Sequence, residues 1–242
     1  MTSSSSSPRL YVESSLAPDA AIAATPTQMH YLLHVLRLKP GNEVRLFNGR
    51  DGEWLAHMSA GKKNVSFTPA RQTRPQNDAE DIFYLFAPLK HARLDYMAQK
   101  ATEMGAAKLM PVITQNTQVS RVNEERLLAN AIEAAEQCNL LCVPSVDAPQ
   151  KLDACLANWD ADRALIFCDE SAAEKSPFET LQSLKNKPCA VLVGPEGGFT
   201  KQERDNLLSA SFIIPVSLGP RVLRADTAAV AALAMLWQAR AA

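Results

Sequence analysis

From Ile82 to the C-terminus, apolar runs of strand length alternate with segments of helical periodicity. This alternation restricts the fold more than any other feature, because strands that alternate with helices form mostly parallel sheets covered by helices. The expected strands are 82–87, 108–113, 163–168, 190–193 and 213–217, and the expected helices are 93–104, 123–137, 178–184, 201–210 and 225–239. We therefore expect an α/β domain over residues 82–242, with ligands bound beyond the carboxyl ends of its strands.

The N-terminal part has a different pattern. Glu43–Phe47 and Glu53–Met58 flank a turn rich in Asn, Asp and Gly, which predicts a hairpin within a small β-rich domain at 8–72. Residues 29–38 predict a short helix in this domain. Residues 73–81 are polar and read as a linker.

The first seven residues, 1–7, are rich in serine and predict a disordered tail without the apolar core of a secretory signal. No apolar run is long enough to span a bilayer. The five cysteines include no CxxC pair, which favours a reducing, cytoplasmic setting.

Charge is informative only locally. The net charge is −1, which does not indicate a nucleic-acid-binding protein, but residues 37–74 hold eight Lys and Arg residues against three acidic residues. A basic module of this kind is typical either of an RNA-contacting appendage or of a solvated β-surface, and charge alone does not separate the two.

Two short segments near the C-terminus carry the strongest functional signal. Gly194–Thr200 (GPEGGFT) and Leu218–Ala228 (LGPRVLRADTA) each follow an expected strand and each lead into an expected helix. Glycine-containing turns at strand ends let the backbone approach a ligand closely. The pair therefore predicts a crevice between neighbouring strands.

Several common sites are excluded or disfavoured. The chain has neither a GxGxxG loop nor a P-loop. His30 and His34 share a helix face but lack a third ligand nearby, so we expect no metal. The alanine-rich last helix fits either close backbone packing or plain helix propensity, and Asp226 in its first turn is a cap by the simplest interpretation.

Five segments together resemble the RsmE family, the bacterial 16S rRNA uridine-N3 methyltransferases of the SPOUT class. Besides the two glycine segments, they are His30–Gly41 with Phe47–Gly49, Gln99–Gly105 and Glu133–Cys138. The resemblance implies a PUA-like β-barrel followed by a SPOUT domain with a trefoil knot. It also implies S-adenosylmethionine (SAM) as cofactor, small-subunit rRNA as partner, and a homodimer.

By position in the family motifs, one side of the SAM pocket would be lined by Gly194, Pro195, Glu196 and Gly197, and the other by Leu218, Gly219, Val222 and Leu223. The candidate RNA-binding cations are Arg9, Arg37, Lys39, Arg45, Lys90 and Arg93.

The chemistry of N3 methylation suggests catalytic roles. Uracil N3 must lose its imide proton before it can accept a methyl group, and a guanidinium suits the anion that develops on O2 or O4. We expect Arg224 or Arg221 to supply it. Asp226 and Glu196 are both candidates for the proton acceptor.

Two positions depart from the family. Asp226 stands where the family usually has Glu, and Asn139–Cys142 replaces a segment that usually carries arginines. The second departure predicts altered RNA contacts. It keeps open another RNA target, and a non-catalytic RNA-binding or assembly protein is the remaining alternative.

Overall fold

The computed structural model describes residues 7–61, 64–77, 79–119, 121–172, 177–185 and 187–241. The expected serine tail lies outside these residues except for Ser7. The chain divides into two compact units, the first comprising residues 1–78 and 135–143 and the second comprising 79–134 and 144–242.

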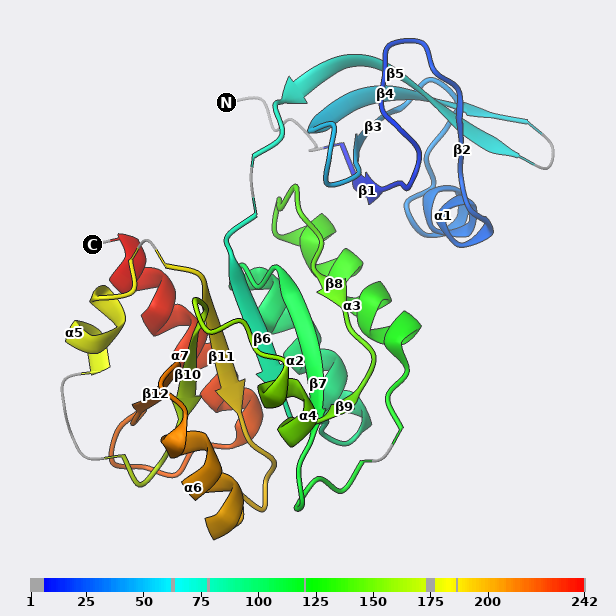
Figure 1. Cartoon of the computed structure of the whole chain (residues 1–242). Coiled ribbons are helices and arrows are strands. Elements are labelled where there is room, and N and C mark those ends of the chain that lie inside the picture. The colour runs from blue at the N-terminus through cyan, green and yellow to red at the C-terminus, as the bar shows by residue number, and fades with distance from the viewer. Residues whose placement is uncertain are drawn as a thin grey trace. The chain divides into compact units, whose positions relative to one another are not determined.

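The first unit is built on a five-stranded sheet in the order β1-β3-β4-β5-β2 (Figure 1). Its strands are β1 (Arg9–Tyr11), β2 (Ile22–Ala23), β3 (Glu43–Phe47), β4 (Glu53–Ala60) and β5 (Val65–Arg74). β3 and β4 pair antiparallel, which confirms the predicted hairpin, and only β1 pairs parallel to its neighbour β3. The core contains Leu32, Val44, Leu46, Met58 and Phe67, all nearly inaccessible to solvent.

The expected helix at 29–38 begins earlier and is interrupted. α1 (Pro26–His30) has a complete capping box between Thr25 and Gln28, and it continues into a π-helical turn, η1 (Tyr31–Val35). The His30 and His34 rings lie 5.1 Å apart on this segment. Among the described residues, no group of three or more His, Cys, Asp or Glu side chains could hold a metal.

The second unit is an α/β layer structure with a parallel sheet in the order β12-β10-β11-β6-β7-β8. The strands are β6 (Ile82–Phe86), β7 (Lys108–Ile113), β8 (Ser145–Val146), β10 (Ala164–Cys168), β11 (Cys189–Val193) and β12 (Ile213–Val216), with β9 (Gln150–Lys151) pairing with β7. All five residues of β11 are buried, as expected of an interior strand covered on both faces. β12 lies at the edge and carries the exposed Pro215.

Helices cover both faces of this sheet. They are α2 (His91–Glu103), α3 (Glu124–Gln137), α4 (Leu152–Ala157), α5 (Pro177–Gln182), α6 (Lys201–Ser209) and α7 (Ala225–Ala241). Leu152 of α4 and Leu207 of α6 share a core cluster with Leu85 of β6. The preceding residue, Tyr84, faces the other way, and its hydroxyl contacts Met97 of α2. The predicted elements are thus confirmed, whereas β8, β9 and α4 are additional.

The domain boundaries differ from those expected in two respects. β5 continues to Arg74, so the segment predicted as a linker begins inside a strand. Residues 135–143 belong to the first unit although they lie far along the chain. No described helix has the length and apolar character needed to cross a membrane.

Candidate cofactor cavity and RNA-facing residues

The two glycine-containing segments lie together at the carboxyl ends of β10, β11 and β12. With the loop after β10 they surround a cavity of about 730 Å³, which is within the range of small-molecule sites. The eight residues expected to bind the cofactor all line it: Gly194, Pro195, Glu196, Gly197, Leu218, Gly219, Val222 and Leu223.

The first segment is a tight turn whose glycine is required by packing. A Cβ atom at Gly194 would lie 2.4 Å from the Phe199 ring, which itself packs edge-on against Phe167 at 5.1 Å. The backbone then turns through a bond from the Gly198 amide to the Pro195 carbonyl and a positive φ of 67° at Gly198. Side-chain volume at Gly194 would therefore displace the aromatic ring that forms one wall of the cavity.

Glu203 fixes the conformation of this segment through hydrogen bonds from backbone amides. Thr200 and Glu203 form a capping box at the start of α6, and Glu203 is only 7% exposed. Its Oε2 accepts from the Thr200 amide at 2.8 Å, and its Oε1 accepts from the Gln115 amide at 2.8 Å. One buried carboxylate thus ties the loop after β11 to the loop after β7, across the intervening strand β6.

Asn116 adds a second tie between the same loops. Its amide nitrogen donates to the carbonyls of Gly197 at 3.1 Å and Gly198 at 3.0 Å. A Cβ atom at Gly197 would lie 3.2 Å from Asn116 Cβ, so the two loops are in close contact.

The second segment is more open. Gly219 has a φ of 111°, which favours glycine. Val222 is 83% exposed although it lines the cavity. Arg221 and Arg224 also line the cavity, whereas Asp226 does not, and Asp226 Oδ1 instead accepts from the Thr227 amide at 2.9 Å in the first turn of α7.

Two further cations in the cavity wall are held by acidic partners. Arg204 donates through Nε and Nη2 to Asp169 Oδ2 at 3.0 and 2.9 Å, and the contact raises the pKa of Arg204. Arg93 is ion-paired with Glu196. Sequence reasoning missed Asp169, Arg204 and Asn116. An acidic residue just beyond a buried strand, as Asp169 is, was the one available signal.

A second, far smaller groove, with a volume of about 10 Å³, lies at the same edge of the sheet. Its lining comes from the loops after β6, β7 and β11: Pro88, Leu89, Lys90, Asn116, Gln118, Val119, Pro195, Glu196 and Gly197. Residues 195–197 thus line both the cavity and this groove.

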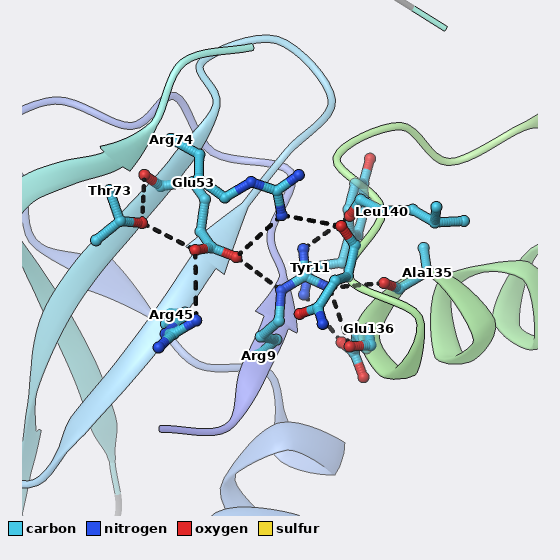
Figure 2. Close-up of polar contacts among 10 residues, drawn as sticks. Arg9, Tyr11, Arg45, Glu53, Thr73, Arg74, Ala135, Glu136 and Leu140 are labelled. Carbon is cyan, nitrogen blue, oxygen red and sulfur yellow. Dashed lines mark hydrogen bonds and ion pairs between the residues drawn. The ribbon is translucent and has the colours of Figure 1, made fainter. Parts of the chain in front are cut away.

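In the first unit, Arg9 is buried and is not a candidate for RNA contact, contrary to the expectation from sequence (Figure 2). Its Nε donates to Glu53 Oε2 at 2.7 Å, and its Nη atoms donate to the carbonyls of Ala135 at 2.7 Å and Leu140 at 2.7 Å. The guanidinium also lies 4.4 Å from the Phe47 ring centroid. Because the guanidinium donates both to Glu53 on β4 and to carbonyls of the 135–143 segment, Arg9 binds this segment to the sheet.

Glu53 is the acidic centre of this network and is 1% exposed. Burial raises its pKa, but hydrogen bonds from Arg9 and Thr73 and the charges of Arg9 and Arg45 outweigh burial, so the pKa lies below its ordinary value. Arg45 is therefore partly engaged, with Nη1 3.8 Å from Glu53 Oε1.

The segment Asn139–Cys142 also has a packing role. Leu141 is buried with Phe47 and Ala135, and Arg74 donates to the Asn139 carbonyl at 2.9 Å. Asn139 itself is exposed, so the prediction of altered RNA contacts at this segment stays a prediction. Of the other RNA-binding candidates, Arg37, Lys39 and Lys90 are exposed.

Comparisons with known proteins agree with this arrangement. An RNA methyltransferase domain family matches residues 76–237, and an RNA methyltransferase PUA domain family matches residues 25–69. The ribosomal RNA small subunit methyltransferase E of Rickettsia conorii is 35% identical over 231 residues, covering 94% of each chain. The protein of that name from Bacillus subtilis is 28% identical over 225 residues, covering 88% of each chain.

Solved structures extend the similarity to the fold. A Legionella pneumophila methyltransferase with bound SAM is 29% identical and superposes with a TM-score of 0.84, covering 96% of this chain and 98% of that one. The ribosomal RNA small subunit methyltransferase E of Neisseria gonorrhoeae bound to SAM is 25% identical, also with a TM-score of 0.84, over 96% of this chain and 97% of that one. The chain described here belongs to the RNA methyltransferase family that includes these ribosomal RNA small subunit methyltransferase E proteins.

Proposed function

We propose that this protein uses SAM to methylate N3 of a uridine in the 16S rRNA of the small ribosomal subunit. The observation that carries the proposal is the convergence of both glycine-containing segments on one cavity at the carboxyl ends of the strands. The relatives named for small-subunit rRNA methylation and the SAM-bound structures support the same reading. A non-catalytic binding protein would have no need for such a cavity.

The residues of the cavity fit SAM. Apolar side chains from Phe167, Leu218 and Leu223 suit an adenine ring, and carboxylates and guanidinia suit the ribose hydroxyls and the amino-acid end. When bound, SAM supplies an electrophilic methyl group on a sulfonium.

Arg224 and Arg221 are proposed to stabilise the uracil anion. Both line the cavity and both are exposed at its mouth, where a base could reach them. A guanidinium donating to O2 or O4 lowers the energy of the anion that forms as the N3 proton leaves. Arg221 and Arg224 would act at the base, whereas Gly194–Gly197 would hold the cofactor.

The proposal includes three features of the whole protein. We propose a homodimer, supported by the large exposed apolar side chains of Tyr96 on α2 and Trp237 on α7. We also propose the trefoil knot of the SPOUT class and a cytoplasmic location, both implied by the family resemblance. The first unit would be the PUA-like RNA-binding module.

The proposal is tested by transfer of a labelled methyl group from SAM to small ribosomal subunits prepared without N3-methyluridine. We expect label in small-subunit RNA and none in large subunits or tRNA. Label in tRNA or large subunits alone would show a different target. The Arg224→Ala variant should lose turnover by about 10²- to 10³-fold, as for removal of an anion-stabilising donor, with SAM affinity changed far less. Turnover near that of the wild type would exclude Arg224.

A further inference from the structure

Arg204 is a cation of the cavity wall that a buried carboxylate holds in one orientation. Its Nε and Nη2 donate to Asp169 Oδ2 at 3.0 and 2.9 Å, and the Asp169 side chain is only 5% exposed. Both residues line the cavity. A guanidinium has five N–H donors, and within the part of the chain that the structure describes Arg204 makes no other side-chain hydrogen bond. Nη1 is therefore left for a ligand.

Asp169 is itself fixed by backbone groups. Its amide donates to the Val216 carbonyl of β12 at 3.0 Å, and its Oδ1 accepts from the Ser171 amide at 3.0 Å. Arg204 lies near the start of α6, where its amide donates to the Thr200 carbonyl at 2.9 Å. The guanidinium is thus oriented before a ligand arrives, which reduces the conformational entropy lost on binding.

We propose that Arg204, oriented by Asp169, binds the carboxylate at the methionine end of SAM and so makes the cavity selective for ligands that carry this group. This inference rests on the cofactor of the proposed function. Arg204 would contact the ligand directly, whereas Asp169 would be a positioning residue that acts through Arg204.

The methionine end of SAM requires a cation and an anion side by side. Its carboxylate is the only anionic group of SAM, and a guanidinium forms short, charge-assisted hydrogen bonds with a carboxylate. The adjacent ammonium needs an acceptor, and Glu170, the residue after Asp169, is exposed and lines the same cavity. The loop after β10 and the start of α6 thus supply both charges.

The other cations of the cavity suit this role less well. Arg93 is paired with Glu196, but their side chains are 39% and 44% exposed, so water screens the pair. Arg221 and Arg224 are exposed at the mouth of the cavity, where the proposed function places the base. Asp169 is far more buried than Glu196, so the orientation of Arg204 persists without a ligand.

The inference is tested by calorimetry with two ligands that differ only in the carboxylate. They are S-adenosylhomocysteine and its decarboxylated analogue, which keeps the amine. We expect the wild type to bind the first about 10- to 100-fold more tightly, as for hydrogen bonds between charged groups. Arg204→Ala should weaken binding of S-adenosylhomocysteine by about the same factor and change binding of the decarboxylated analogue by less than about threefold.

The second ligand and two further variants serve as controls. A cavity that collapsed in Arg204→Ala would lose affinity for both ligands equally, and that result would overturn the assignment. Arg204→Lys keeps the charge but not the planar group, so it should retain part of the selectivity. Lys201→Ala changes an exposed lysine on the same helix and should leave both affinities as in the wild type.

The remaining outcomes separate this inference from the proposed function. Unchanged selectivity in Arg204→Ala, or its loss in Arg221→Ala or Arg224→Ala instead, would overturn the assignment. Weaker binding of an rRNA fragment by Arg204→Ala with unchanged selectivity would also overturn it, by placing the cation on a phosphate. A wild type that binds neither SAM nor S-adenosylhomocysteine would contradict the proposed function and this inference together. Selectivity through Arg204 without formation of N3-methyluridine would contradict only the proposed reaction.

Discussion

At the scale of single residues, the Arg9–Glu53 pair shows why a cation near the start of a basic domain is not an RNA ligand. Arg9 is buried, and its donors go to Glu53 and to carbonyls of the 135–143 segment (Figure 2). Buried charges are tolerated only when they are paired and hydrogen-bonded. The stability of the first unit therefore depends on the carboxylate of Glu53.

Glu53→Gln should lower the free energy of unfolding by about 3 to 5 kcal/mol, because it leaves the Arg9 charge buried without an opposite charge beside it. Urea unfolding followed by circular dichroism measures the change. Glu43→Gln, on the neighbouring strand β3 but exposed, is the matched control and should change stability by less than about 0.5 kcal/mol. Equal values for the two variants would contradict the network.

The same pair predicts a pH dependence. The pKa of Glu53 is lower in the folded protein than in the unfolded chain, so its stabilising contribution is complete above the unfolded value of 4.5 and is lost as the pH falls through the folded value. The stability difference between wild type and Glu53→Gln should be constant above about pH 5.5 and shrink below about pH 4.5. A difference that stays constant down to pH 3 would show that the charge of Glu53 is not involved.

Gly194 tests the packing of the cofactor cavity. Gly194→Ala would place a methyl group 2.4 Å from the Phe199 ring, so the ring must move into or away from the cavity. We expect SAM affinity to fall by about tenfold or more, equivalent to about 1.4 kcal/mol. Adding Phe199→Leu should recover part of the loss, and no recovery would mean that the ring is not the cause.

At the scale of elements, the shape of the cavity depends on the loop after β11, which hydrogen bonds to Glu203 hold in place. Glu203→Ala removes the carboxylate that accepts from the Thr200 amide in the capping box of α6, and it removes the acceptor for the Gln115 amide. SAM affinity should fall by about tenfold, with a loss of about 1 kcal/mol in stability from the cap. Gln202→Ala, exposed on the same helix, is the control. An unchanged SAM affinity in Glu203→Ala would show that the hydrogen bonds to Glu203 do not determine the conformation of the loop.

The elements also show what sequence reasoning reaches. The strands and helices of the second unit and the hairpin of the first follow from local periodicity, and the two glycine segments lie where strand ends require them. Glu203, by contrast, acts on Gln115, 88 positions away, and Arg9 acts on Ala135, 126 positions away. Local periodicity carries no information about such partners, so the burial of Arg9 and the packing of 135–143 were missed.

At the scale of the whole molecule, two compact units contribute separately to the proposed activity. The second unit holds the cavity and the groove, and the first unit presents Arg37 and Lys39 as exposed cations. Phosphate contacts position an RNA and make binding sensitive to salt, whereas chemistry at the base depends on the residues that line the cavity. Replacing Arg37 and Lys39 together with Ala should therefore weaken rRNA binding and reduce its salt dependence, while SAM affinity stays unchanged.

The central claim is that this protein methylates N3 of one uridine in 16S rRNA. The most direct measurement incubates small subunits lacking that methyl group with protein and SAM, and then maps reverse-transcription stops and nucleoside masses. A methyl group on N3 blocks the pairing edge, so the account predicts one new stop in 16S rRNA together with the mass of a methyluridine, both absent with Arg224→Ala. No new stop, or a methylated nucleoside other than N3-methyluridine, would contradict it.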